Sequence, residues 1–219
     1  MNNRQGILDK WNRKLGRYAI SNLMLYIVAG MALVYVADLA LSMTKGISLV
    51  SLLAFDKAAI LRGEVWRVLT FVLLPPDSSI LFILFALYFY WLIGSALENQ
   101  WGSFRFNVFY FCGVLCTILS GLITGYATNQ YLNLSLFFAF ALLYPDFQIM
   151  LFFMLPIKIK YLAILDAVFF LVSFIFSSWP GRIALLIALA NIALFFGRDF
   201  INMIRNWDRR RRFRRDTRR

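Results

Sequence analysis

Histidine, the residue that most often moves protons in an active site, does not occur in this sequence. Its absence removes the usual general base for a buried serine and the commonest protein ligand of zinc. The two cysteines, Cys112 and Cys116, cannot complete a four-ligand metal site without histidine partners. They lie one helical turn apart in an apolar segment, so we predict that they are small packing residues. We therefore predict no metal, no cofactor and no catalytic residue.

A serine–lysine dyad is the next chemistry to consider, because lysine replaces histidine as the base in some proteases. Lys45 and Lys57 fall in a predicted outer loop, whereas Lys158 and Lys160 fall at the predicted cytoplasmic rim. None of the four is placed to reach a serine in the middle of a membrane.

Two carboxylates fall inside predicted membrane helices, Asp38 and Asp166. A rise of about 1.5 Å per residue puts Asp38 near the outer end of its helix and Asp166 about 9 Å from the inner end of its own. The two are therefore predicted on opposite sides of the membrane, where they cannot share a proton as an aspartyl protease requires.

Asp166 and Asn191 are still candidate functional residues, because polar groups inside a membrane are costly and are often kept for a role. Simpler roles stay open for both. Asp166 would be favoured by the dipole at the start of a helix and could pair with Lys158 or Lys160. Asn191 could form a hydrogen bond between two helices.

The elements that must position these residues are membrane helices. Apolar residues make up 61% of the chain and charged residues 16%, whereas a soluble domain has about a half and a quarter. Charge-free intervals of about the length that a helix needs to cross a bilayer separate short charged segments. We predict an all-α, polytopic membrane protein with six transmembrane helices, over residues 20–42, 79–97, 106–126, 131–144, 161–176 and 183–200.

The distribution of basic residues predicts the topology. Five basic residues precede the first helix, and an arginine-rich segment, residues 205–219, follows the last. By the positive-inside rule both termini are cytoplasmic, so the number of spans is even. The predicted parts are a basic tail (1–19), a membrane domain (20–200) and an arginine-rich tail (201–219). No cleavable signal peptide is evident, and we favour a bacterial plasma membrane over the endoplasmic reticulum.

The arginine-rich tail has several open interpretations. It can set the topology or contact anionic membrane lipid, and we favour these over contact with nucleic acid. A solvated, disordered tail is the remaining interpretation.

The segment between the first two helices, residues 44–78, is not a simple linker. It contains two apolar stretches, 47–55 and 65–74, that are interrupted by polar positions and are too short to span a bilayer. We predict that they lie in the membrane interface. The fourth and sixth predicted helices are also short, so either the bilayer thins beside them or longer helices enclose them.

Three segments resemble signature elements of the rhomboid-like superfamily and occur in the same order. Residues 63–70, with Trp66 and Arg67, resemble the tryptophan–arginine motif in the first loop of rhomboids and Derlins. Residues 97–106, with Glu98 and Gly102, are similar to the family's Glu-x-x-x-Gly-Ser turn and form the most specific match. Residues 140–145 and 152–162 are similar to the end of the fourth helix and the turn into the fifth. The resemblance implies a six-helix rhomboid-like bundle with an interfacial first loop.

The catalytic residues of rhomboid proteases do not carry over. Under this resemblance, the second-helix histidine and asparagine that help to hold the oxyanion would fall near Phe82 and Ala86. The serine nucleophile would fall on Gln130, and the sixth-helix histidine near Leu186. An alignment shifted so that Ser135 takes the serine position still leaves no histidine to activate it.

The resemblance therefore implies a pseudoprotease, closer in logic to Derlins, which lack the dyad and handle misfolded membrane proteins. We expect it to bind transmembrane segments of client proteins laterally, for retention, escort or quality control. Trp66 and Arg67 would hold the outer loop, or serve only as an interfacial anchor and a snorkelling arginine. No Derlin carboxy-terminal partner motif is recognisable, so Derlin partners are not transferred.

Two other functions stay open. One is an active intramembrane protease with unrecognised catalytic groups. The other is a small transporter, which would call for internal repeats or broken helices that the sequence does not display.

Overall fold

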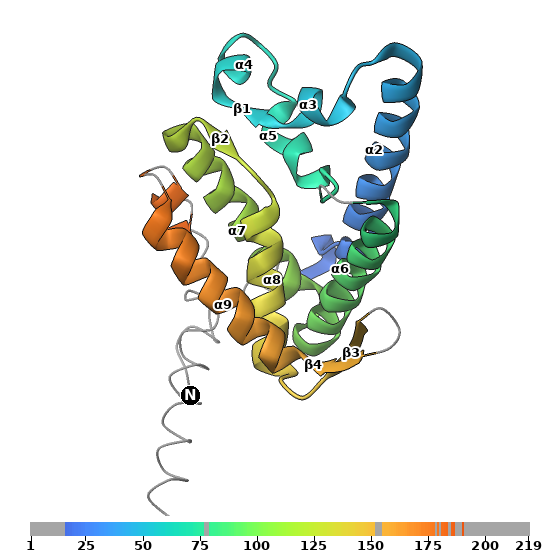
Figure 1. The fold of residues 1–219 in the computed structure, drawn as a ribbon, viewed down its shortest axis with the longest axis vertical. Helices are drawn as coiled ribbons and strands as arrows, with labels where there is room; N and C mark the ends of the chain where they lie inside the picture. Colours follow the sequence, from blue (N-terminus) through green and yellow to red (C-terminus); the bar gives the residue numbers. More distant parts are fainter. Residues whose placement is uncertain are drawn as a thin grey trace, which may run out of the picture.

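Helices dominate the structure. A computed structural model describes residues 16–76, 79–151, 155–177, 179, 181–183, 185, 186 and 190. In chain order the elements are η1 (Gly16–Tyr18), α2 (Leu23–Lys45), α3 (Leu49–Leu53), β1 (Phe55–Asp56), α4 (Lys57–Leu61), α5 (Arg67–Thr70), η2 (Phe71–Leu73), α6 (Ile80–Trp101), α7 (Ser103–Thr124), β2 (Tyr126–Ala127), α8 (Gln130–Leu143), β3 (Gln148–Leu151), β4 (Leu155–Lys158) and α9 (Ile159–Phe176) (Figure 1). Residues 1–15, most of the predicted sixth helix with Asn191, and the arginine-rich tail lie outside the described residues.

Four helices of the described part are long and apolar enough to cross a membrane: α2 with η1, α6, α7 and α9. A shorter apolar helix, α8, has 14 residues. These five coincide with the first five predicted spans, with ends that differ by a few residues. The chain is thus an all-α, multi-pass membrane protein. The number of spans and their orientation are still predictions.

α6, α7 and α8 connect α2 on one side of the bundle with α9 on the other. α2 packs along α6, α6 contacts α7 and α8, and α9 packs on α8 (Figure 1). A Cβ atom placed on Gly94 of α6 would lie 2.3 Å from Cγ of Met24 on α2. The absence of a side chain at Gly94 therefore allows the close approach of these two helices.

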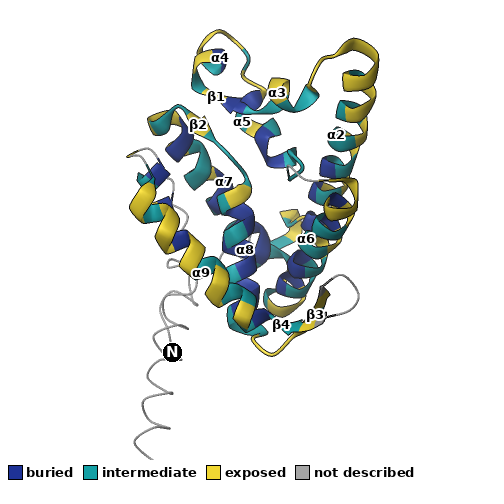
Figure 2. Ribbon diagram, viewed as in Figure 1, coloured by how far each residue is buried: buried dark blue, intermediate teal, exposed yellow. Residues whose placement is uncertain are grey.

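α8 and α9 have contrasting surroundings. Eight of the 14 residues of α8 are buried, and the helix is only about 21 Å long at 1.5 Å per residue. Longer helices enclose it, which is one of the two outcomes predicted for a short span. On α9 only 11% of the spanning segment is buried, against 44% on α7, and Figure 2 shows a largely exposed helix.

The connection between α6 and α7 is far shorter than predicted. Residues 98–105 were expected to form a loop, but helix continues to Trp101 and resumes at Ser103. Gly102 alone separates the two helices, with φ 82° and ψ 152°. Because only glycine adopts this backbone conformation without strain, Gly102 makes the sharp reversal possible.

The segment between α2 and α6, named the outer loop after its predicted side of the membrane, is a folded structure that docks on the helices. β1 pairs antiparallel with β2, with Phe55 opposite Ala127 and Asp56 opposite Tyr126. A Cβ atom on Gly121 of α7 would lie 2.6 Å from the ring of Phe55, so this glycine makes room for the loop. The side-chain amide of Asn129 donates to the carbonyls of Val72 and Leu74, at 3.1 and 2.7 Å. These contacts tie two parts of the loop, at residues 55–56 and 72–74, to the segment between α7 and α8.

A β-hairpin lies between α8 and α9, where the sequence predicted a loop over residues 145–160. β3 pairs antiparallel with β4, with Gln148 opposite Lys158 and Ile149 opposite Ile157. Figure 1 shows the hairpin at the end of the molecule opposite β1 and β2.

Candidate functional site

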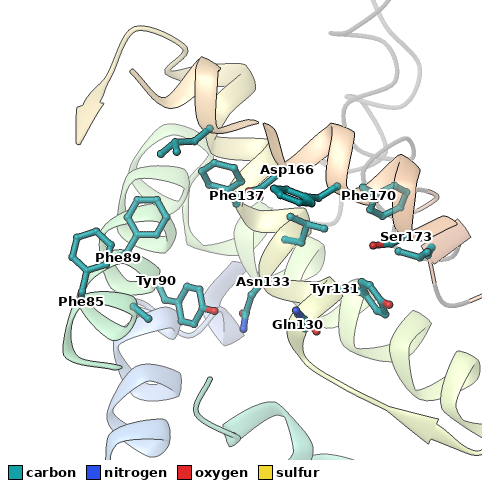
Figure 3. A pocket seen from close by; sticks show the side chains of 15 residues that line it. Phe85, Phe89, Tyr90, Gln130, Tyr131, Asn133, Phe137, Asp166, Phe170 and Ser173 are labelled. Atoms are coloured by element: carbon teal, nitrogen blue, oxygen red, sulfur yellow. The ribbon is translucent and has the colours of Figure 1, made fainter. Parts of the chain in front are cut away.

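One candidate site is a cavity of about 550 Å³ between three helices. Its walls come from α6, α8 and α9, with one further residue, Leu185 (Figure 3). The lining residues that the structure describes are Phe85, Ala86, Phe89, Tyr90, Gln130, Tyr131, Asn133, Leu134, Phe137, Leu162, Asp166, Phe169, Phe170, Ser173 and Leu185. The volume lies in the range of small-ligand pockets, about 300–1,000 Å³.

Polar groups stand out in this mostly aromatic and aliphatic lining. Tyr90 from α6 points toward Asn133 from α8 (Figure 3), and the two side chains form a hydrogen bond. Asn133 is 5% exposed, and its amide oxygen Oδ1 has no partner. A buried oxygen without a partner costs about 1–3 kcal/mol, so it calls for an explanation. Gln130, Asp166 and Ser173 add further polar groups from α8 and α9.

Asp166 was predicted to lie at the start of a helix, where the dipole favours it, and to pair with Lys158 or Lys160. Both predictions are wrong. Asp166 is the eighth residue of α9, and no acidic residue occupies the first turn of that helix, where the dipole acts. The ammonium groups of Lys158 and Lys160 lie instead on Oδ1 of Asp146, at 3.4 and 3.2 Å. Asp166 lines the cavity and is half-buried there.

Asp38 does not line the cavity that Asp166 lines. Its Oδ1 accepts hydrogen bonds from the Ser48 hydroxyl and the Val50 backbone N–H, at 3.2 and 3.0 Å. Asp38 thereby holds the start of α3 against α2. Within the described residues, no cluster of three metal-binding side chains occurs, and Cys112 and Cys116 are free thiols.

The positions aligned with lost catalytic residues are partly gathered at the cavity. Ala86 and Gln130 line it, although they are 44 positions apart in the chain. Leu186 follows the lining residue Leu185 and is half exposed. Phe82, one turn before Ala86, is 47% exposed and is not among the lining residues. Two of the four aligned positions therefore line the cavity.

Ser135, the alternative serine, is 1% exposed and does not line the cavity. Its hydroxyl donates to the Leu132 carbonyl at 2.7 Å, as serines within helices commonly do.

Trp66 and Arg67 organise the outer loop by binding consecutive backbone carbonyls. Arg67 is 7% exposed, and its Nη1 donates to the carbonyls of Ser51 and Ala54 at 2.7 and 2.8 Å. Trp66 Nε1 donates to Leu52 O at 3.4 Å, and the Thr70 hydroxyl donates to Leu53 O at 2.9 Å. Four successive carbonyls at the end of α3 thus accept hydrogen bonds. The last carbonyls of a helix have no donor within that helix, so these bonds replace the missing partners. Figure 1 shows this loop at one end of the bundle.

Arg67 is itself oriented by Glu64. The Arg67 Nε lies 2.6 Å from Glu64 Oε2, in a charge-assisted hydrogen bond. The predicted loop-holding role of the tryptophan–arginine motif thus has a geometric basis, whereas Trp66 also leaves half of its surface exposed for an interface.

Glu98 and Gly102 form the second motif. Glu98 is 7% exposed, and its Oε1 accepts from the Ser103 hydroxyl at 2.6 Å and from the Asn22 backbone N–H at 2.8 Å. Asn22 has a positive φ of 57°, a conformation that asparagine tolerates better than most residues. The motif therefore fastens the start of α2 to the α6–α7 reversal.

Sequence reasoning missed Tyr90 and Asn133. Asn133 has a signal that could have found it, because it lies between Leu132 and Leu134 in a predicted span. Tyr90 has none, since it is one of many aromatic residues in its helix. Asn191, the other intramembrane candidate, lies outside the described residues.

No protein-family model matches the chain, and no curated protein matches it significantly.

Proposed function

We propose that this protein is a rhomboid-like pseudoprotease that binds transmembrane segments of client proteins from within the membrane and does not cleave them. The observation that carries the proposal is the cavity between α6, α8 and α9, lined mainly by apolar side chains with a few buried polar groups. Of the two sequence motifs that resemble the family, the one around Arg67 holds the loop between α2 and α6, and the one around Glu98 joins α2, α6 and α7.

The shape of the site suits the side chains of a helix. A cavity of about 550 Å³ holds several side chains and is too small for a whole helix, so a client would lie along the rim. α9 forms one wall and is the least buried of the four long helices in the described part. Transmembrane helices associate through packing and hydrogen bonds, and this cavity offers both.

Binding without cleavage is proposed because the sequence lacks the histidine that would activate a serine nucleophile. The chain has no histidine, and the position aligned with the nucleophile is Gln130, whose amide is not a nucleophile under ordinary conditions. The hydroxyl of Ser135 is directed to a backbone carbonyl of its own helix.

Site-directed photocrosslinking in native membranes tests the proposal. A photoreactive residue replaces Phe89, Phe137 or Phe170, which line the cavity from three different helices. The matched control replaces Leu33, which is 72% exposed on α2 and does not line the cavity. We expect transmembrane segments of other proteins to crosslink at the cavity positions and not at Leu33. Equal crosslinking at all positions, or none at the cavity, contradicts the proposal.

A further inference from the structure

Asp166 is the one charged side chain among the described residues that line the cavity. Asp166 presents a carboxylate, and the Oδ1 of Asn133 is fully buried without a partner. Among the described residues that line the cavity there is no lysine or arginine. The two lysines nearest in sequence to Asp166, Lys158 and Lys160, are held by Asp146.

A carboxylate and an unpaired amide oxygen are costly in a membrane, and so is a basic side chain on an isolated transmembrane helix. Pairing the basic side chain with the carboxylate lowers the cost of burying either one, because each charge then has an opposite charge in place of lipid. An apolar client offers no such gain. A client with a basic residue at the matching depth gains the ion pair with Asp166.

We propose that the cavity selects transmembrane segments that carry a single lysine or arginine, which pairs with the carboxylate of Asp166. This inference rests on the proposed function and names the chemistry of the client. Asp166 is the eighth residue of α9, about 10 Å from the start of that helix by its rise. The basic residue of the client therefore lies roughly seven residues from the membrane boundary on the side of the β3–β4 hairpin.

The test uses the full-length protein, with the crosslinking residue at Phe137, and a set of leucine–alanine transmembrane segments. The segments carry lysine, glutamine or leucine at the seventh position from the hairpin side. We expect the lysine segment to be captured about five- to tenfold more than the leucine segment, with glutamine close to leucine. Moving the lysine one turn toward the centre lowers its capture.

Variants assign the preference to Asp166. Asp166→Asn is expected to reduce capture of the lysine segment to the level of the leucine segment, and Asp166→Glu to retain the preference. Asp146→Asn, which changes a carboxylate outside the cavity, is the matched control and retains it as well. Thermal unfolding of each variant in mild detergent verifies that it is folded.

The outcomes separate this inference from the proposed function. Equal capture of all three segments, or a lysine preference that persists in Asp166→Asn, overturns the inference while client binding stands. Crosslinking of Phe137 to the chain's own arginine-rich tail in place of added segments also overturns it. Capture of no segment by any variant overturns the proposed function itself.

Discussion

Glu98 Oε1 accepts a hydrogen bond from the backbone N–H of Asn22 at 2.8 Å, although 76 positions separate the two residues. The same oxygen accepts the Ser103 hydroxyl from the far side of the Gly102 break. One buried carboxylate thereby joins the start of α2, the end of α6 and the start of α7. Glu98 therefore has a structural role, because it holds three helix ends together through hydrogen bonds.

Glu98→Ala is predicted to lower the free energy of unfolding by about 2–3 kcal/mol, because the Asn22 N–H and the Ser103 hydroxyl lose a charged acceptor. Glu98→Gln keeps an acceptor oxygen and is predicted to cost about 1 kcal/mol. Equilibrium unfolding in mild detergent measures both. Asn99→Ala, at an exposed position in the same helix, serves as control and is expected to change stability by less than about 0.5 kcal/mol. An equal loss for Ala and Gln at residue 98 would contradict the argument.

Arg67→Lys is predicted to loosen the outer loop although it keeps the positive charge. The planar guanidinium reaches Glu64, Ser51 and Ala54 at once, and a lysine ammonium does not reproduce this fork. We expect a loss of about 1–3 kcal/mol and faster proteolysis within residues 49–54. Arg62→Lys, on an exposed arginine of the same loop, is the control. Proteolysis at the wild-type rate in Arg67→Lys would show that the loop does not depend on these bonds.

The apolar pattern was sufficient to predict the five longest helices that the structure describes, and it identified residues 47–55 and 65–74 as more than a simple linker. It was not sufficient for the features that depend on contacts between distant residues. The pairing of β1 with β2 brings residues 55–56 beside residues 126–127, and no local sequence pattern predicts this pairing. The β3–β4 hairpin was missed because its short apolar strands lack the alternation that identifies a half-buried strand.

For the candidate site, the sequence identified the residues better than their surroundings. Arg67 and Glu98 were selected by resemblance, but their partners most distant in the chain are backbone groups, which a sequence pattern does not reveal. Asp166 was selected because it is a charge in an apolar run, yet its expected partners bind Asp146. The cavity itself depends on how α6, α8 and α9 pack, and this is a property of the fold.

Gly94→Ala is predicted to destabilise the contact of α2 with α6. The new Cβ would lie 2.3 Å from Cγ and 2.4 Å from Cβ of Met24, so the two helices must separate or Met24 must shift. Such overpacking costs about 1–3 kcal/mol. Ser95→Ala, at the neighbouring position, adds no atom and is the control. Combination with Met24→Gly, which removes both clashing atoms, should make the Gly94→Ala step less costly in a double-mutant cycle. A full cost in both backgrounds would place the strain elsewhere.

Stability is predicted to fall in acid through Asp146. The hydrogen bond and charge of Lys160, and then those of Lys158, lower the pKa of Asp146 below its ordinary value of 3.8. Because the folded-state pKa is the lower one, the stabilisation is complete above pH 3.8 and is lost as the pH falls through the folded-state pKa. Asp146→Asn should remove this part of the pH dependence. Hydrogen exchange of the hairpin backbone between pH 3 and 6 measures it, after correction for the intrinsic exchange rate. Identical pH profiles in the two proteins would contradict the assignment.

The hydrogen-bonded pair of Tyr90 and Asn133 gives the last prediction, which concerns why buried polar groups are retained at the cavity. If the pair serves the structure, its removal should lower the free energy of unfolding. If the pair is kept for binding, its removal should not. Asn133 Oδ1 has no partner, so the double variant Tyr90→Phe, Asn133→Leu removes an uncompensated buried oxygen together with the bond. We predict that its free energy of unfolding is unchanged or raised by about 0.5–2 kcal/mol, while crosslinking of client segments at the cavity decreases. Asn133→Leu alone leaves the Tyr90 hydroxyl without its partner and should be the less stable of the two variants. Equilibrium unfolding and the crosslinking assay, applied to the same preparations, give both quantities. A double variant that is clearly destabilised, with client capture intact, would make the pair part of the structural core and remove it from the binding site.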